Sequence, residues 1–256
     1  MLPALERLPM EHALLAETVT IAGGGGDPIE AYLARPTGAG PRGSVVLIHH
    51  MPGYDRATKE MARRFADAGF ATLCPNLYSR EAPGASPDDA AAAVRASGGV
   101  ADEQVVADIA AAAAHLRSLP GSNGAVGLIG HCSGGRQAVL AACSVDVQAA
   151  VDCYGAYLVE PRPNGAPATM VPLVDLLSDV RCPVLGLFGV EDQHPSPEHV
   201  AQLDELLTSH GKPHEFHTYD GAGHAFFAAD RPSYRPEAAV DGWARILTFF
   251  GTHLQG

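Results

Sequence analysis

A cysteine lies in a glycine-rich stretch that could form a sharp turn between a strand and a helix. The stretch is residues 130–135, Gly-His-Cys-Ser-Gly-Gly. It follows an apolar run at 125–129 and precedes residues 136–142, which are typical of a helix. This is the layout of the Gly-x-Ser-x-Gly nucleophile elbow with sulfur in place of oxygen. The pattern predicts an exposed Cys132 near a helix N-terminus, where the helix dipole favours a thiolate.

The geometry of the elbow requires the glycines that lie two positions before and two positions after Cys132. Strand and helix backbones approach closely in such an elbow, and side chains there would clash. The alternative interpretation is a buried structural cysteine in a tight strand-to-helix turn.

Two further residues could complete a catalytic triad in the order nucleophile, acid, base. Asp192 follows the apolar run 184–189, and His224 lies in a glycine-rich loop after the alternating run 214–219. A nucleophile needs a base, and the base needs an orienting carboxylate. Each candidate follows a predicted strand, at the sheet edge where ligands bind in α/β proteins. Glu191 is a rival for the acid role, and His224 could instead be a loop histidine bonded to backbone.

The elements that must position these residues alternate between strand and helix, which predicts a mostly parallel, doubly wound α/β sheet. Residues 16–35 predict an antiparallel hairpin at the N-terminal side, with glycines 23–26 in its turn. Further strands are expected at 45–48, 70–74, 125–129, 149–154, 184–188 and 214–219. Helices are expected near 58–68, at 90–93, along 105–116, at 136–142 and along 240–250. We expect one domain over residues 1–256, with an N-terminal extension at 1–14 and a pocket-covering insertion at 157–175.

Composition narrows the class of partner. A chain of 256 residues with 46% hydrophobic residues can bury one sizeable core. A net charge of −12 argues against nucleic acid and anionic membrane surfaces. No apolar run approaches the roughly 18 residues that cross a bilayer, and the N-terminus lacks the pattern of a secretion signal. We expect a small-molecule substrate, no membrane partner, and a monomer or homodimer.

The cysteines favour a free catalytic thiol over a disulfide framework or a zinc site. They are odd in number, scattered and without a Cys-x-x-Cys pair, at positions 74, 132, 143, 153 and 182. A reducing cytoplasm suits such a thiol. His49 and His50 are adjacent on a predicted strand, so their side chains point to opposite faces and do not favour a metal. We expect neither a metal nor a cofactor.

Over about residues 44–250 the chain resembles the dienelactone hydrolases, or carboxymethylenebutenolidases, of the α/β-hydrolase superfamily. The resemblance depends on the cysteine elbow, on residues 74–84 with their Leu-Tyr-x-Arg pattern, on the Ser-Asn-Gly turn at 122–124, and on Gly223-His224-x-Phe226. It implies an α/β-hydrolase fold with Cys132 as nucleophile, His224 as base and Asp192 as orienting acid.

An oxyanion hole should accompany this triad. One donor is expected to be the backbone N–H of Ser133, the residue after the nucleophile. The resemblance implies Met51 N–H as the second donor, since Pro52 has no N–H. One such donor typically stabilises the transition state by about 2.7–4 kcal/mol.

The chain departs from the family it resembles at position 50, where dienelactone hydrolases carry a glutamate that interacts with the thiol. Here the residue is His50. A neutral imidazole can accept a hydrogen bond, and a protonated one would favour the thiolate. The alternative is that His50 only fills space beneath the oxyanion loop.

The expected substrate-binding residues are His50, Arg80, Tyr154 and Phe226. Arg80 matches the family arginine that helps to bind the dienelactone carboxylate, although a salt-bridged surface arginine is its alternative. The family's second arginine is replaced by Ala228, and the serine after the catalytic histidine by Ala225. Arg231 and Arg235, further along, are candidates to compensate. Loss of one arginine weakens the case for a small anionic lactone and favours a more hydrophobic acyl or alcohol group.

These residues predict a cysteine-dependent hydrolase of ester, lactone or thioester bonds that acts through an acyl-enzyme. Three alternatives remain: a promiscuous arylesterase or phosphotriesterase at the same site, a non-catalytic ligand-binding α/β-hydrolase, and a redox-active thiol protein. The intact triad disfavours the second. The lack of a resolving cysteine close to Cys132 disfavours the third.

Overall fold

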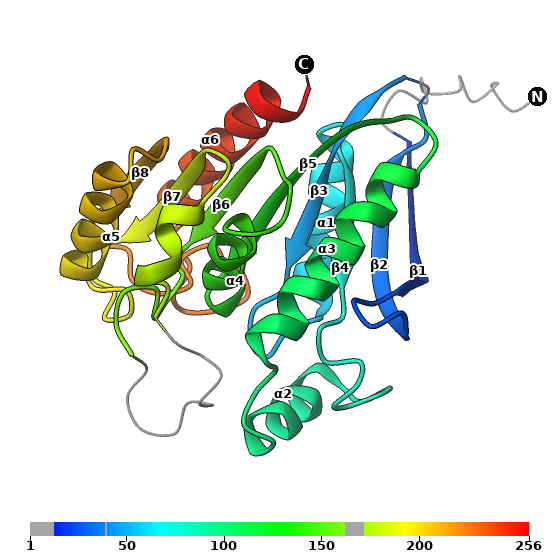
Figure 1. Cartoon of the computed structure of the whole chain (residues 1–256), viewed down its shortest axis with the longest axis horizontal. Coiled ribbons are helices and arrows are strands. Elements are labelled where there is room, and N and C mark those ends of the chain that lie inside the picture. The colour runs from blue at the N-terminus through cyan, green and yellow to red at the C-terminus, as the bar shows by residue number, and fades with distance from the viewer. Residues whose placement is uncertain (1–12, 39, 162–171, 256) are drawn as a thin grey trace, which may run out of the picture.

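A computed structural model describes residues 13–38, 40–161 and 172–255. Eight strands form one sheet in the order β1-β2-β4-β3-β5-β6-β7-β8 (Figure 1). The two strands at one edge form the expected hairpin, and β2 pairs antiparallel with β4. All later pairs are parallel, which confirms the doubly wound α/β sheet. The strands are β1 (Leu14–Ala22), β2 (Pro28–Pro36), β3 (Arg42–Ile48), β4 (Ala71–Pro75), β5 (Ser122–His131), β6 (Ala149–Cys153), β7 (Val184–Gly189) and β8 (His214–Tyr219).

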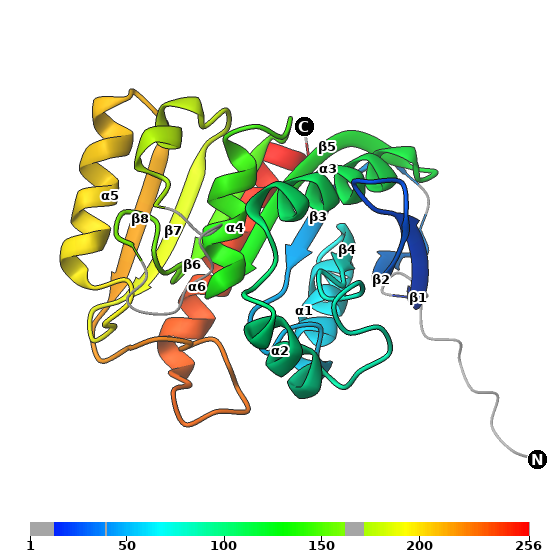
Figure 2. The same cartoon turned by 60° about the horizontal axis from the view of Figure 1, so that its bottom comes forward.

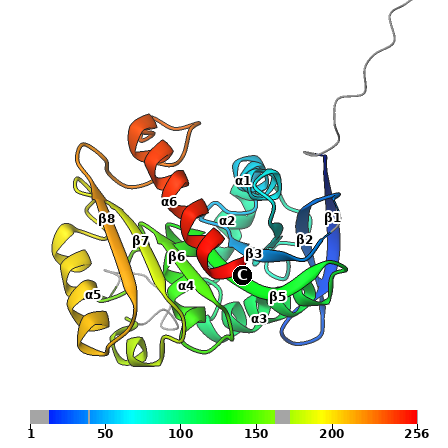
Figure 3. The ribbon, with the colours of Figure 1, turned by 90° about the horizontal axis from the view of Figure 1, so that it is seen from above.

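Helices cover both faces of the sheet (Figures 2 and 3). Helices α1 and α6 pack on one face, where Phe65 of α1 contacts Trp243 and Phe250 of α6. Helices α3, α4 and α5 contribute to the apolar layer on the other face. The helices are α1 (Arg56–Asp67), α2 (Pro87–Ala96), α3 (Asp102–Ser118), α4 (Ser133–Ala142), α5 (Pro197–Ser209) and α6 (Pro236–Leu254), with a short 3₁₀ helix η2 (Val174–Asp179).

Two local features differ from expectation. The Ser-Asn-Gly turn expected at 122–124 lies inside β5, where the pairing with β3 shifts register between Arg42 and Ser44. Helix α5 was not predicted, although Ser196 caps it and Pro197 occupies its first turn. A Ser-Pro pair of this kind is a helix-start signal.

The structure describes only parts of the expected N-terminal extension and of the expected insertion. Residues 1–12 of the expected N-terminal extension and 162–171 of the expected insertion lie outside the described residues. Within the described part of the chain, no helix combines the length and apolar character that a membrane crossing needs.

Candidate active site

Cys132 occupies a tight turn between β5 and α4. Its backbone has φ 56° and ψ −121°, a region that residues with side chains rarely adopt. A Cβ atom at Gly130 would lie 2.0 Å from the carbonyl carbon of Gly134, and one at Gly134 would lie 2.4 Å from the Ile48 oxygen. The chain can therefore make this turn only with glycine at both positions, and the turn holds Cys132 at the end of β5.

Asp192 and His224 meet at the same edge of the sheet. They follow the adjacent parallel strands β7 and β8, and Asp192 Oδ2 lies 2.8 Å from His224 Nδ1. The second carboxylate oxygen, Oδ1, accepts the His194 N–H at 2.9 Å. Asp192 is buried, and both of its carboxylate oxygens are hydrogen-bonded to the protein. This geometry leaves the other ring nitrogen of His224 available for a partner.

The electrostatic environment of His224 favours its charged form. Burial by itself lowers the pKa of His224, because it penalises the imidazolium. The hydrogen bond to Asp192 and the proximity of Cys132 outweigh burial and raise the pKa to about 10. His224 is thus suited to hold a proton opposite a thiolate.

Cys132 and His224 both line a cavity of about 500 Å³. Residues of α1 and of the loop 225–231 form much of its wall. A volume of this order fits a small-molecule ligand. Met51 and His50, two of the expected site residues, also line it.

The two expected aromatic residues differ in their placement. Tyr154 lines the cavity, and its ring packs edge-on against His224 with centroids 5.2 Å apart. Phe226 is fully buried and is not among the lining residues; it stacks on Phe227, which does line the cavity. Phe226 thus supports the wall from behind.

The two backbone N–H groups that are expected to bind the oxyanion make no hydrogen bond within the described part of the chain. Within the described residues, neither the Met51 N–H nor the Ser133 N–H donates to another group of the protein. Cys132 N–H, in contrast, donates to Cys153 O at 3.0 Å. Unpaired backbone N–H groups beside a nucleophile are the donor set that a developing oxyanion requires.

His50 pairs with the carboxylate of Asp55, the residue that caps the N-terminus of α1. Its Nε2 lies 3.3 Å from Asp55 Oδ2, and Asp55 Oδ1 caps α1 by accepting the Thr58 N–H at 2.8 Å. Burial raises the pKa of Asp55, but the bonds from His50 and Thr58 outweigh it and lower the pKa to about 2. An anionic group therefore stands next to the imidazole at position 50.

Arg80 lies elsewhere. Its guanidinium bonds Asp27 in the hairpin turn and Asp108 on α3, each at 2.6 Å, and Asp108 has no exposed side-chain surface. Asp108 also accepts the Gly24 N–H at 2.8 Å. Arg80 is not among the residues that line the cavity. The salt-bridged alternative describes this placement, and the substrate-binding role expected for Arg80 does not fit it.

Arg231 and Arg235, the candidates to compensate for the missing family arginine, also differ in their placement. Arg231 lines the cavity, whereas Arg235 donates to backbone oxygens, including that of Gly221 at 2.8 Å. Ala225 and Ala228 line the cavity as well.

Sequence reasoning gave no role to His131, the last residue of β5. The ring lines the cavity beside Cys132, yet the residue is only 4% exposed. Tyr154 and Phe227 pack around it with centroids 5.8 and 5.4 Å away. Burial lowers the pKa of His131 to about 3, so the ring is neutral near pH 7. The only sequence signal is a polar residue at the end of an apolar strand.

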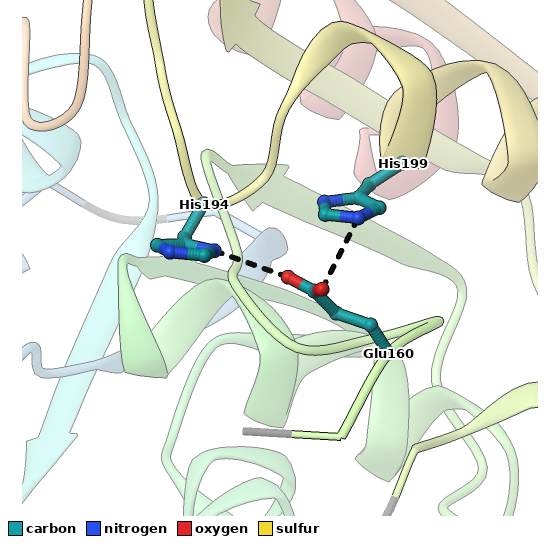
Figure 4. A group of neighbouring side chains, drawn as sticks. All are labelled: Glu160, His194 and His199. Carbon is teal, nitrogen blue, oxygen red and sulfur yellow. Dashed lines mark hydrogen bonds and ion pairs between the residues drawn. The ribbon is translucent and has the colours of Figure 1, made fainter. Parts of the chain in front are cut away.

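Glu160, His194 and His199 form a cluster that the sequence did not predict (Figure 4). The two carboxylate oxygens lie 3.1 Å from His194 Nδ1 and 3.2 Å from His199 Nε2. These groups are close enough to share a metal ion. However, His199 Nδ1 accepts the Ser196 N–H at 3.2 Å, so the neutral ring carries its proton on Nε2. A metal at Nε2 would have to displace that proton, and two histidines hydrogen-bonded to one carboxylate describe the cluster better.

The sequence and the fold agree with one group of known proteins. The family model for the dienelactone hydrolase family matches residues 29–254. The chain belongs to the dienelactone hydrolase family. A provisionally named carboxymethylenebutenolidase from Synechocystis sp. is 30% identical over 232 residues, covering 89% of this chain and 93% of the relative. Members of this family hydrolyse ester or lactone bonds, and this chain is accordingly a hydrolase of that class.

Solved structures show the same fold. The crystal structure of a provisionally named dienelactone hydrolase from Klebsiella pneumoniae has a TM-score of 0.83 and 30% identity, covering 94% of this chain and all of the other. A dienelactone-hydrolase-like promiscuous phosphotriesterase from metagenomic libraries has a TM-score of 0.75 at 20% identity, covering 94% of this chain and 99% of the other. This second similarity concerns the fold alone.

Proposed function

We propose that the protein hydrolyses esters, lactones or thioesters with Cys132 as nucleophile. His224 takes the thiol proton, and the thiolate attacks the substrate carbonyl carbon. The N–H groups of Met51 and Ser133 bind the oxyanion. The carbon–oxygen or carbon–sulfur bond then breaks, and His224 gives its proton to the leaving group. Water, deprotonated by His224, attacks the resulting thioester, which releases the acid and restores the thiol.

One observation carries this proposal. Cys132, fixed at positive φ by its glycines, shares a cavity with His224, whose far nitrogen is held by the buried Asp192. Nucleophile, base and orienting carboxylate come from three different strand ends, so no local structural need explains their meeting.

The part of the cavity wall formed by loop 225–228 is apolar, while Arg56, Arg64 and Arg231 line other parts of the cavity. Ala225, Phe227 and Ala228 line one side, and Arg80, the expected carboxylate partner, is bound to Asp108 instead. We propose hydrophobic acyl or alcohol groups rather than a small anionic lactone. The five cysteines are all free, which suits a reducing compartment such as the cytoplasm.

The test is hydrolysis of p-nitrophenyl acetate. Cys132→Ala should abolish turnover, and Cys132→Ser should be much slower than the parent, because His224 is tuned to a thiolate. Cys143→Ser is the matched control, since Cys143 is buried at the far end of α4 and should leave activity intact. Full activity in Cys132→Ala would refute the nucleophile.

A further inference from the structure

Glu160 joins His194, in the loop between β7 and α5, to His199 in the first turn of α5 (Figure 4). An ionised carboxylate only accepts hydrogen bonds, so both ring nitrogens donate to it, over 3.1 Å from His194 Nδ1 and 3.2 Å from His199 Nε2. The backbone N–H of His194 donates in turn to Asp192 Oδ1 at 2.9 Å. One carboxylate therefore ties the residue that supports Asp192 to the start of α5.

Glu160 is carried by a segment, residues 154–160, that follows β6 and is anchored before it reaches the loop. The Gly155 N–H donates to a buried carboxylate of β6 at 2.7 Å, and the buried Leu158 accepts the Leu173 N–H at 2.6 Å. Ordering two flexible side chains offsets much of what an exposed ion pair contributes. Glu160 reaches its partners from a fixed backbone with 28% of its side chain exposed, so less of its effect is lost in this way.

The same segment contacts both partners of the acid–base pair. Tyr154 packs edge-on against the His224 ring, with centroids 5.2 Å apart. Tyr157 stacks on the His194 ring, with centroids 5.3 Å apart and planes at 29°. Both tyrosines have positive φ, 46° and 63°, which residues with side chains rarely adopt. Backbone strain of this kind persists only where the surrounding contacts hold it, so the segment is a rigid support for the loop.

The position of the His194 N–H sets the position of the Asp192 carboxylate. Asp192 Oδ2 bonds His224 Nδ1 at 2.8 Å, and Oδ1 is held by that N–H. A shift of the loop would turn the carboxylate away from the imidazole. Misplacement of a supporting group by about 1 Å can lower a rate by about 100-fold, so the bonds that hold His194 matter to the chemistry.

We propose that Glu160 is a positioning residue for the hydrolysis: through His194 it keeps the Asp192 carboxylate aligned with His224. Glu160 is not among the residues that line the cavity, so it acts without touching the substrate. The inference rests on the proposed hydrolysis at Cys132 and extends the triad by one carboxylate outside the cavity.

The experiment removes the Glu160 carboxylate and follows both the rate and the imidazole. Glu160→Ala should lower kcat/KM for p-nitrophenyl acetate by about tenfold. The titration midpoint of His224, followed by NMR of its ring nitrogens, should fall by about one pH unit, because the imidazolium loses its aligned carboxylate. Glu160→Gln keeps one acceptor oxygen and should recover part of both effects.

Asp204→Ala is the matched control. Asp204 also bonds a histidine, His214 at 3.0 Å, but His214 begins β8 whereas His224 follows its end. This variant should leave the rate and the His224 titration unchanged.

Thermal unfolding separates positioning from stability. A Glu160→Ala protein that melts at lower temperature but keeps either the parent kcat/KM or the parent His224 midpoint would overturn the inference. If the alanine variant does not fold, the same criteria apply to Glu160→Gln. Failure of the proposed function looks different: the parent itself would hydrolyse no ester, and the His224 titration would then decide alone whether Glu160 aligns the pair.

Discussion

At the residue scale, the proposed mechanism depends on how the Asp192 carboxylate controls the His224 imidazole. Asp192 Oδ2 holds His224 Nδ1 at 2.8 Å and, with Cys132, raises the pKa of His224 despite burial. A protonated His224 is what a poor leaving group needs, because an alkoxide must take a proton as it departs. Hydrolysis of alkyl esters and lactones should therefore persist to high pH.

Asp192→Asn should move the alkaline limit of this activity. In the parent protein, His224 loses its proton near pH 10, so kcat/KM for an alkyl ester should fall only around that value. Without the Asp192 carboxylate the charged ring loses its main stabilising partner, and the fall should occur at lower pH with a reduced maximum. The measurement is kcat/KM between pH 5 and 11. An alkaline limit that does not move would contradict the role of Asp192.

At the element scale, β5 and α4 can form the elbow only because their backbones touch. The contact distances at Gly130 and Gly134 leave no room for a methyl group. The hairpin β1–β2 depends on a different device, the pair of carboxylates around Arg80 that joins its turn to α3. The close backbone contact positions Cys132, and the Arg80 ion pairs stabilise an edge of the sheet away from it.

Gly130→Ala should destabilise the protein by about 3 kcal/mol and strongly reduce activity, because the new Cβ would overlap the Gly134 carbonyl carbon. The matched control is Gly251→Ala in α6, where no atom lies near the new methyl group. That change should stabilise the fold by about 0.5–1 kcal/mol, as expected for alanine in a helix interior. Chemical denaturation of both variants provides the comparison, and equal effects would contradict the steric argument.

Arg80→Ala should lower the free energy of unfolding by about 1.5–3 kcal/mol, since the buried Asp108 loses a charged hydrogen-bond partner. It should lower kcat/KM for esters with and without a substrate carboxylate by the same small factor. Urea unfolding and a matched pair of such esters test both statements. A selective loss on the carboxylate ester would restore Arg80 to the substrate site and bring the preferred substrate closer to a dienelactone.

At the scale of the whole molecule, a buried carboxyl in the central sheet links stability to pH. Asp152 of β6 accepts the Gly155 N–H at 2.7 Å with Oδ1, while Oδ2 has no partner among the described residues. Burial raises the pKa of Asp152 from 3.8 to about 7, against the opposing effects of Gly155 and His224. The folded protein thus holds a proton that the unfolded chain releases near pH 4.

The contribution of Asp152 to stability should therefore fall as the pH rises from 4 to 7, because the unfolded state loses the Asp152 proton first. Asp152→Asn, which is neutral at every pH, should gain stability relative to the parent over the same range, by on the order of 4 kcal/mol. Urea unfolding of both proteins at pH 4, 5.5 and 7 measures this difference. A constant difference across these pH values would show that Asp152 is ionised in the folded state.

Local patterns in the chain were enough to predict the doubly wound sheet, the hairpin and the elbow. Apolar runs of strand length and glycines two positions from Cys132 act over neighbouring residues, so their consequences can be deduced without a structure. The order of Cys132, Asp192 and His224 after three strands of the sheet is of the same kind, since parallel strands bring their ends to one edge. Helix α5 was within reach too, through its Ser-Pro start.

Only the tertiary structure decided which side chains share the cavity. Arg80 looked like a substrate ligand until the hairpin turn and α3 brought Asp27 and Asp108 to it. His131 looked like a strand-end residue until Tyr154 and Phe227, distant in the chain, enclosed it next to Cys132. Partners of this kind come from elements far apart in sequence, and the free energy of burying or pairing a charge depends on those partners, which no local pattern encodes.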